Sequence, residues 1–282
     1  MENLILSQEN DPGTHLSYRE IAMETGIPRT GVQRIVKNDL GLTPFKFTNV
    51  QRLTNRDEMK RVERCKKLLR HLTLARLEKT FFTDEKIFKL QAPNNKQNDR
   101  VYGVNLSDII EKGYSEKSHY PSSVMISAGV SKIGKTSIHF VAPGVKINSA
   151  YYCNDVLSQL LPEMEDMSNG DYIFMQDGAR SHTSKVTLAY LDEHCYELLK
   201  PDFWPPNSPD LNPCDYAIWG TMEANIWKRR RNKITTLEEL KERIVEVWDA
   251  LPQEFINRSI DSFRKRVNMV VQKNGGHIEK YI

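Results

Sequence analysis

Residues 81–88 read Phe81-Phe82-Thr83-Asp84-Glu85-Lys86-Ile87-Phe88, and they mark the point where helical patterning gives way to extended patterning. Aromatic and β-branched residues gather in short runs from Thr80 onward, as in β-strands. Asp84 stands inside this run, and a carboxylate in a strand that otherwise looks buried costs free energy unless it is paired or binds a cation. The run therefore predicts both the first strand of a sheet and a candidate site on it.

The elements after this run predict the fold class. We expect strands over 123–130, 136–141 and 172–175, helices over 151–164 and 184–194, and a short extended segment over 196–199. Strands that first form a meander and then alternate with helices predict an α/β domain with a mixed sheet. The polar interval 91–120 predicts a long loop inserted between the first two strands.

Composition sets outer limits on the protein class. The 282 residues are 39% hydrophobic with a formal charge of +3, which excludes collagen-like and globally disordered chains. No run approaches the roughly 20 apolar residues of a membrane-spanning helix, and we expect a soluble intracellular protein. The four cysteines are far apart with no CxxC pair, which favours reduced thiols over a zinc ribbon or a disulfide framework.

The N-terminal region predicts a helix-turn-helix. After an irregular arm of fifteen residues, Ser17 and Glu20 form a capping-box pattern, and Gly26-Ile27-Pro28 ends the first helix. A second helix begins near Arg29, and in DNA-binding helix-turn-helix proteins that helix enters the major groove. An ordinary helical hairpin is the alternative. The candidate DNA contacts on the second helix are Arg29, Thr30, Gln33, Arg34 and Lys37.

Basic residues concentrate in the front part of the chain. Residues 28–79 contain fourteen Lys and Arg against five Asp and Glu, which indicates a region that binds a polyanion. Within it, residues 52–77 predict a basic helical connector that could also touch DNA backbone. Its apolar stripe would include Met59 and Cys65, with Arg61 facing elsewhere. A second basic run, 228–233, predicts either a solvated helix end or a phosphate contact.

Three aspartates fall at the ends or in the middle of predicted elements. Asp84 lies in the first strand, Asp177 ends the strand that begins at Tyr172, and Asp215 precedes a helix after a proline-rich segment. A few carboxylates, with water and substrate phosphates, are the usual ligands of Mg²⁺, and a pair of such ions about 4 Å apart catalyses phosphoryl transfer. Taken singly, each aspartate is better explained by a salt bridge, a turn or a helix cap than by metal binding.

Together, three motifs resemble the catalytic boxes of the Tc1/mariner superfamily of DNA transposases. They are Thr83-Asp84-Glu85, Gln176-Asp177-Gly178-Ala179-Arg180-Ser181-His182, and the segment from Trp204 to Tyr216, with 92 residues between the first two aspartates and 37 between the last two. The resemblance implies an RNase H-like catalytic domain behind helix-turn-helix modules. It also implies that Asp84, Asp177 and Asp215 are catalytic residues and metal ligands. The final Asp and the 37-residue spacer resemble the mariner-like DD37D type.

Residues near the three aspartates receive separate interpretations. Glu85 would face the opposite side of the sheet from Asp84, which favours a structural ion pair over metal ligation. Asp210 is a candidate fourth acid, but side-chain to backbone hydrogen bonds that organise its loop are the favoured interpretation. Arg180 and His182 are candidates for contacts behind the metal ligands or with DNA phosphates, and packing at a helix start is the alternative.

The resemblance also implies function and organisation. We expect residues 1–48 to form the helix-turn-helix module, 49–79 the connector and 80–282 the catalytic domain. There is room for one helix-turn-helix, where the family usually has two. The implied activity uses two Mg²⁺ or Mn²⁺ ions to cleave phosphodiester bonds at transposon ends. It then joins the cleaved ends to target DNA at a TA dinucleotide. The implied partners are double-stranded DNA, namely terminal inverted repeats and target, and a second copy of the chain in a synaptic complex in the nucleus.

Two alternatives remain at this stage. A transposon-derived DNA-binding protein that is catalytically idle would explain the short N-terminus, and a generic RNase H-like nuclease would explain the acids alone.

Overall fold

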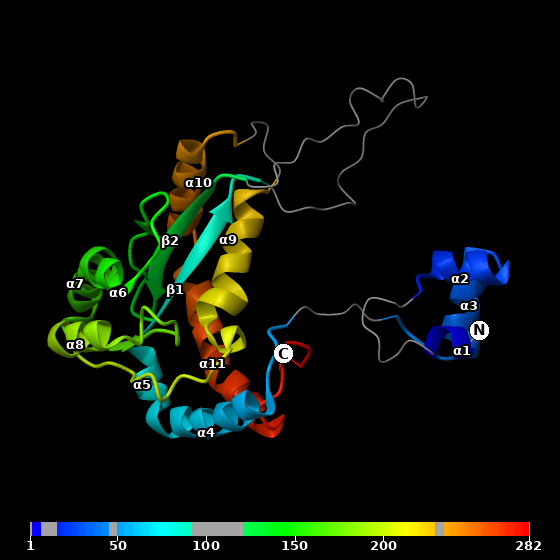
Figure 1. Cartoon of the computed structure of the whole chain (residues 1–282), viewed down its shortest axis with the longest axis horizontal. Helices are drawn as coiled ribbons and strands as arrows, with labels where there is room; N and C mark the ends of the chain where they lie inside the picture. The colour runs from blue at the N-terminus through cyan, green and yellow to red at the C-terminus, as the bar shows by residue number, and fades with distance from the viewer. Residues whose placement is uncertain (1, 7–15, 45–49, 92–120, 229–233, 282) are drawn as a thin grey trace. The chain divides into compact units, whose positions relative to one another are not determined.

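The computed structural model shows two compact units, residues 1–51 and 52–282, and each is described by itself (Figure 1). The structure describes residues 2–6, 16–44, 50–91, 121–228 and 234–281. Of the predicted inserted loop, residues 91–120, only Gln91 lies among the described residues. The same holds for 229–233, most of the second basic run.

The first unit contains the predicted pair of helices. Its elements are α1 (Glu2–Leu6), α2 (Tyr18–Thr25), α3 (Arg29–Arg34) and a π-helical turn η1 (Ile35–Asp39) that continues α3. Ser17 caps α2 in a capping box with Glu20, and Gly26 ends α2 with a left-handed φ of 68°. The predicted helix boundaries are confirmed at both positions.

The prediction of an irregular N-terminal arm was wrong for residues 2–6, which form α1. Leu4 and Ile5 pack against the small core of Ile21, Val32 and Val36. This contact explains the helix, because five residues have too few hydrogen bonds to be helical without an apolar face to bury.

The second unit is built on a four-stranded mixed sheet. Its strands are β1 (Thr80–Lys89), β2 (Ser123–Val130), β3 (His139–Phe140) and β4 (Ile173–Met175), in the order β3-β2-β1-β4. β1 pairs antiparallel with β2 and parallel with β4, which confirms the mixed sheet. β3 is shorter than predicted because the backbone N–H of Ser137 donates to Glu163 (2.6 Å) instead of to a neighbouring strand.

Helices cover both faces of this sheet (Figure 1). Successive residues of a strand point to opposite faces, so Phe81 packs with Tyr152 and Leu160 on one face while Phe82 packs with Phe263 on the other. The first face carries α6 (Ser149–Tyr151), the π-helix η3 (Tyr152–Leu157), α7 (Ser158–Ser168) and α8 (Lys185–His194). The second face carries α4 (Asn55–His71), α5 (Leu74–Glu78), η4 (Pro209–Leu211), η5 (Cys214–Ile218), α9 (Trp219–Ile226), α10 (Leu237–Asp249) and α11 (Gln253–Gln272).

The basic helix that was predicted as a connector is α4, which packs against α11 within the second unit. Cys65 is buried as predicted, but Arg61 is also fully buried and Met59 is 67% exposed. The predicted direction of Arg61 was wrong, because residues four apart share a helix face and Arg61 precedes Cys65 by one turn. The close packing extends to Gly275, where a Cβ atom would lie 2.2 Å from the backbone oxygen of Glu58.

Among the helices that the structure describes, none has the length and apolar character needed to cross a membrane. The four cysteines are free thiols: Cys65, Cys153 and Cys214 are buried and Cys195 is half-buried.

Candidate active site

The parallel pairing of β1 with β4 places Asp84 and Asp177 at the same level of the sheet. Phe82 pairs with Met175 at the end of the parallel ladder, and each aspartate follows two residues after its member of that pair. The hydroxyl of Thr83 donates to the backbone oxygen of Met175 (2.8 Å) and holds the two strands together at this point. The parallel pairing of β1 and β4 therefore places both carboxylates at the same place along the sheet.

Asp215 is brought to β1 by the proline-rich segment. The side chain of Asn212 donates to the backbone oxygen of Thr83 (3.1 Å) and accepts from the N–H of Cys214 (3.1 Å). Asp215 then lies in the first turn of η5, which continues into α9. In α9, Trp219 Nε1 donates to Asp84 Oδ2 (2.6 Å), so the helix that carries Asp215 is also bonded to Asp84.

The charges of neighbouring acids act on Asp84 and Asp215. Burial raises the pKa of Asp84 well above its ordinary value, and the nearby charges of Asp215, Glu85 and Asp177 raise it further. Asp215 keeps an exposed side, yet removal of its carboxyl group from water and the charge of Asp177 raise its pKa to about 6. Carboxylates that repel one another in this way are stabilised by a cation, and carboxylate oxygen is the ligand type that Mg²⁺ and Mn²⁺ accept.

Two of the three carboxylates accept hydrogen bonds from protein donors. Asp84 accepts from Trp219, and Asp177 Oδ1 accepts from the N–H of Ala179 (2.9 Å). In the described ranges, no three His, Cys, Asp or Glu side chains are arranged closely enough to surround one ion. Three carboxylates of like charge fit a divalent cation. The hydrogen bonds from Trp219 and Ala179 occupy part of the lone pairs of Asp84 and Asp177.

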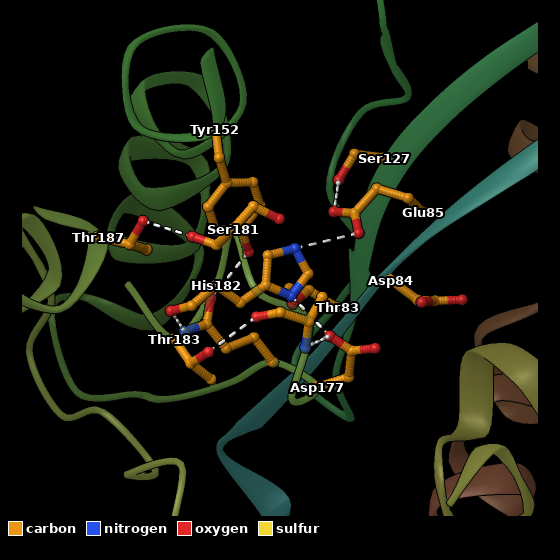
Figure 2. A network of polar contacts seen from close by, with 12 residues as sticks. Thr83, Asp84, Glu85, Ser127, Tyr152, Asp177, Ser181, His182, Thr183 and Thr187 are labelled. Carbon is orange, nitrogen blue, oxygen red and sulfur yellow. Dashed lines mark hydrogen bonds and ion pairs between the residues drawn. The ribbon is translucent and has the colours of Figure 1, made fainter. Parts of the chain in front are cut away.

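His182 lies between two acids in a group that we call the His182 cluster, consisting of Glu85, Ser127, Tyr152, Asp177 and His182 (Figure 2). Its Nδ1 is 2.6 Å from Asp177 Oδ1, and its Nε2 is 3.3 Å from Glu85 Oε2. Burial disfavours the charged imidazolium, but the hydrogen bonds to Asp177 and Glu85 raise the pKa of His182 to about 10. The predicted ion pair of Glu85 is confirmed, and its partner is His182.

The same contacts act on Asp177 in the opposite direction. Burial favours the neutral carboxyl group, but the hydrogen bond with His182, its positive charge and the N–H of Ala179 hold the pKa of Asp177 below its ordinary value. Asp177 is therefore the acid of the three that is ionised most readily in the absence of a cation.

Asp210 does not join the three aspartates in a shared contact. Its two carboxylate oxygens accept from Arg61 Nη1 (3.1 Å) and Nη2 (2.6 Å), and both side chains are almost fully buried. Arg61 also donates to the backbone oxygens of Asn207 and Gly275 and to Ser208 Oγ. We call these five residues the Arg61 cluster. Asp210 does organise its loop, but through Arg61 and not through the predicted side-chain to backbone bonds.

The remaining candidate residues are on the surface. Arg180 is exposed after β4, and on α3 and η1 the side chains of Arg29, Thr30, Gln33, Arg34 and Lys37 are all exposed. Val32 and Val36 alternate with them and form the buried side of the same helix. The candidate DNA contacts thus lie on the face of the helix that does not pack against α2.

Two residues near the carboxylates were not singled out in the sequence. Trp219 lies one helical turn after Asp215, a spacing that places both on one side of a helix. Lys86 lies two residues after Asp84 on the same face of β1, and its charge lowers the pKa of Asp215. The sequence could have revealed both residues: Trp219 lies four positions after Asp215 in a predicted helix, and Lys86 lies two positions after Asp84 in a predicted strand.

Two transposases are similar in sequence to nearly the whole of this chain. The Tc3 transposase of Caenorhabditis elegans is 25% identical over 276 residues, which cover 98% of this chain and 79% of the relative. The Tc1 transposase of the same organism is 26% identical and covers 97% of both. The Mos1 mariner paired-end complex with Mg matches the structure with a TM-score of 0.74 at 20% identity, over 98% of this chain and 79% of that one. No family model matches the sequence.

A mixed sheet covered by helices on both faces, with acids gathered at the end of the β1–β4 ladder, defines an RNase H-like domain, and the likeness to Mos1 supports this fold. Over nearly its whole length, the chain is similar to transposases of the Tc1 and Tc3 type.

Proposed function

We propose that this chain is a DNA transposase that cuts phosphodiester bonds at transposon ends and joins the ends to target DNA. Its relatives Tc3 and Tc1 are transposases along nearly the whole of this chain. The proposal is carried by contacts between three separate segments. Asp84 and Asp177 follow paired residues of β1 and β4, and Trp219, in the helix that continues from the turn of Asp215, donates to Asp84 Oδ2 (2.6 Å).

The three aspartates are the proposed ligands of two Mg²⁺ or Mn²⁺ ions. Bound there, such ions would activate the attacking oxygen and stabilise the leaving oxygen of the phosphodiester. The chain's own contribution is positional: β1 and β4 hold Asp84 and Asp177 in register, and Asn212 fixes the start of the helix that carries Asp215. The final Asp and the spacing favour the mariner-like DD37D type.

The first unit is the proposed DNA-recognition module. The exposed side chains of α3 and η1 would contact base edges and phosphates of a terminal inverted repeat, as the second helix of a helix-turn-helix does. In the second unit, Arg180 is exposed three residues after Asp177 and is a proposed contact for a DNA phosphate. We further propose a homodimer that pairs two transposon ends, a TA target, and action in the nucleus, where chromosomal DNA is found.

A catalytically idle DNA-binding protein is the weaker alternative. Loss of catalysis would remove the reason to keep carboxylates whose charges raise the pKa of Asp84 and Asp215, yet all three acids are present. The presence of a helix-turn-helix in the same chain disfavours a generic nuclease.

The test is a plasmid-nicking assay with the full chain, the DNA flanks of its gene as substrate, and Mn²⁺ or EDTA. Asp177→Ala should lower Mn²⁺-dependent nicking by at least a hundredfold and leave DNA binding in a gel shift unchanged. Asp192→Ala, which removes an exposed acid on α8, is the matched control and should cut like the wild type. Equal cutting by Asp177→Ala would reject the proposed active site, and binding without nicking by the wild type would favour the idle protein.

A further inference from the structure

We propose that Glu85 and His182 are positioning residues for Asp177: together they fix one oxygen of its carboxylate and leave the other free to bind a cation. The inference rests on the proposed function and assigns a role to an acid on the sheet face opposite Asp84. Neither residue is proposed to contact the ion.

The ring of His182 cannot turn freely. It is 4% exposed and stacks on Tyr152, with ring centroids 4.2 Å apart and an interplanar angle of 29°. Its backbone oxygen accepts from Gln176 Nε2 (3.0 Å), and Gln176 in turn accepts from the hydroxyl of Tyr152 (2.9 Å). Packing and these two hydrogen bonds therefore determine where Nδ1 and Nε2 point.

Both ring nitrogens face acids. An ionised carboxylate only accepts hydrogen bonds, so His182 donates from Nδ1 to Asp177 and from Nε2 to Glu85. Glu85 is itself held, because Ser127 Oγ donates to its Oε1 (3.1 Å) and its side chain is 17% exposed. A continuous series of contacts thus runs from β2 through Glu85 and His182 to Asp177 (Figure 2).

The two oxygens of Asp177 have different surroundings. Oδ1 accepts from both His182 and the N–H of Ala179. Within the ranges that the structure describes, no hydrogen bond reaches Oδ2, and Figure 2 shows it directed away from His182. Since a hydrogen-bonded oxygen is a poorer ligand, the cluster selects which oxygen a cation meets and fixes its direction.

The experiment measures Mn²⁺ binding to the full chain without DNA, by electron paramagnetic resonance of the free ion. His182→Ala should weaken binding tenfold or more, within the ten- to hundredfold range of residues that support metal ligands. Glu85→Gln keeps the shape of the side chain but not its charge, and should weaken binding severalfold. His182→Gln should recover part of the loss in His182→Ala, because an amide N–H can still donate to Asp177.

His194 offers a matched control. It also stacks on a tyrosine, Tyr190, with centroids 4.2 Å apart, and its Nδ1 lies 2.9 Å from a backbone oxygen, but among the described residues its ring nitrogens form no ion pair with an acid. His194→Ala should bind Mn²⁺ with wild-type affinity. Circular dichroism and thermal melting establish that each variant is folded, and if His182→Ala unfolds, Glu85→Gln decides the matter.

Wild-type affinity in folded Glu85→Gln and His182→Ala would overturn the inference while leaving the proposed function intact. A wild-type chain that binds no Mn²⁺ at all would overturn both, and this result is distinguishable because it appears before any variant is made.

Discussion

The Arg61 cluster and the His182 cluster are both built around a buried cationic side chain, yet they differ in closure. Arg61 and Asp210 expose 1% and 2% of their side chains, and Arg61 also donates to Asn207, Ser208 and Gly275. In the His182 cluster, His182 is 4% exposed but Asp177 is 43% exposed. The first cluster is closed to solvent, and the second opens to solvent through one carboxylate.

This difference indicates what each cluster is suited to do. A guanidinium is charged at every accessible pH and its fork matches both oxygens of Asp210, so nothing is left for a ligand. An imidazole donates a single bond to each acid, and among the residues that the structure describes the second oxygen of Asp177 has no hydrogen-bond partner. The closed cluster therefore holds α4, the loop before η5 and the end of α11 together, whereas the open one prepares a ligand.

The largest expected effect comes from breaking the closed cluster. Arg61→Met should lower the free energy of unfolding by about 3–5 kcal/mol, because it leaves the buried charge of Asp210 without a partner. Urea denaturation monitored by circular dichroism measures the loss. Arg61→Met with Asp210→Leu should regain much of it, and Arg70→Met, at an exposed position on α4, should change little. A loss below 1 kcal/mol in Arg61→Met would remove the distinction between the clusters.

An intermediate effect is expected from adding a cation. Mn²⁺ at a hundred times its Kd should stabilise the wild type by about 2.7 kcal/mol, because it binds the folded state alone. Differential scanning calorimetry should then show Tm rising by several degrees. Asp84→Asn should abolish this rise, whereas Asp210→Asn should start from a lower Tm and show the same rise. A rise that depends on Asp210 would place the ion at the wrong cluster.

The smallest effect compares one hydroxyl in each cluster. Ser208→Ala removes an acceptor of Arg61 at 2.6 Å and should cost about 2 kcal/mol, as hydrogen bonds to buried charges do. Ser127→Ala removes the donor to Glu85 at 3.1 Å and should cost about 1 kcal/mol, because water can reach Glu85. Urea denaturation of both variants gives the two values, and the reverse order would contradict the assignment of closed and open clusters.

Sequence patterns predicted the elements that have a strong local period. The capping box at Ser17, the strand 123–130 and the helix that ends at His194 were all found from residues within a few positions of one another. The ion pair of Glu85 was also predicted, because strand alternation alone separates it from Asp84. Its partner was not, since His182 lies 97 positions further along and only the parallel pairing of β1 with β4 brings it near.

The errors have a common physical cause. Arg61 was placed on the outside because an arginine is rarely buried without an acid, and its acid lies 149 positions away in the chain. The short helix α1 was missed because it depends on a core formed by other helices. The strand 136–141 was too long because Glu163 of α7 competes for the backbone of Ser137. Each depends on a tertiary contact that no local period reveals.

Strand β1 sends neighbouring acids to different sides of the sheet, and this makes the strand intolerant of changes in length. Inserting or deleting one residue between Phe81 and Asp84 would turn every later side chain of the strand over, so that Glu85 would take the side of Trp219 and Asp84 the side of Tyr152. The sequence would still contain Asp84 followed by Glu85, but their side chains would exchange faces of the sheet. Homologues of this chain should therefore carry insertions and deletions elsewhere and keep the length of β1 up to Asp84 unchanged.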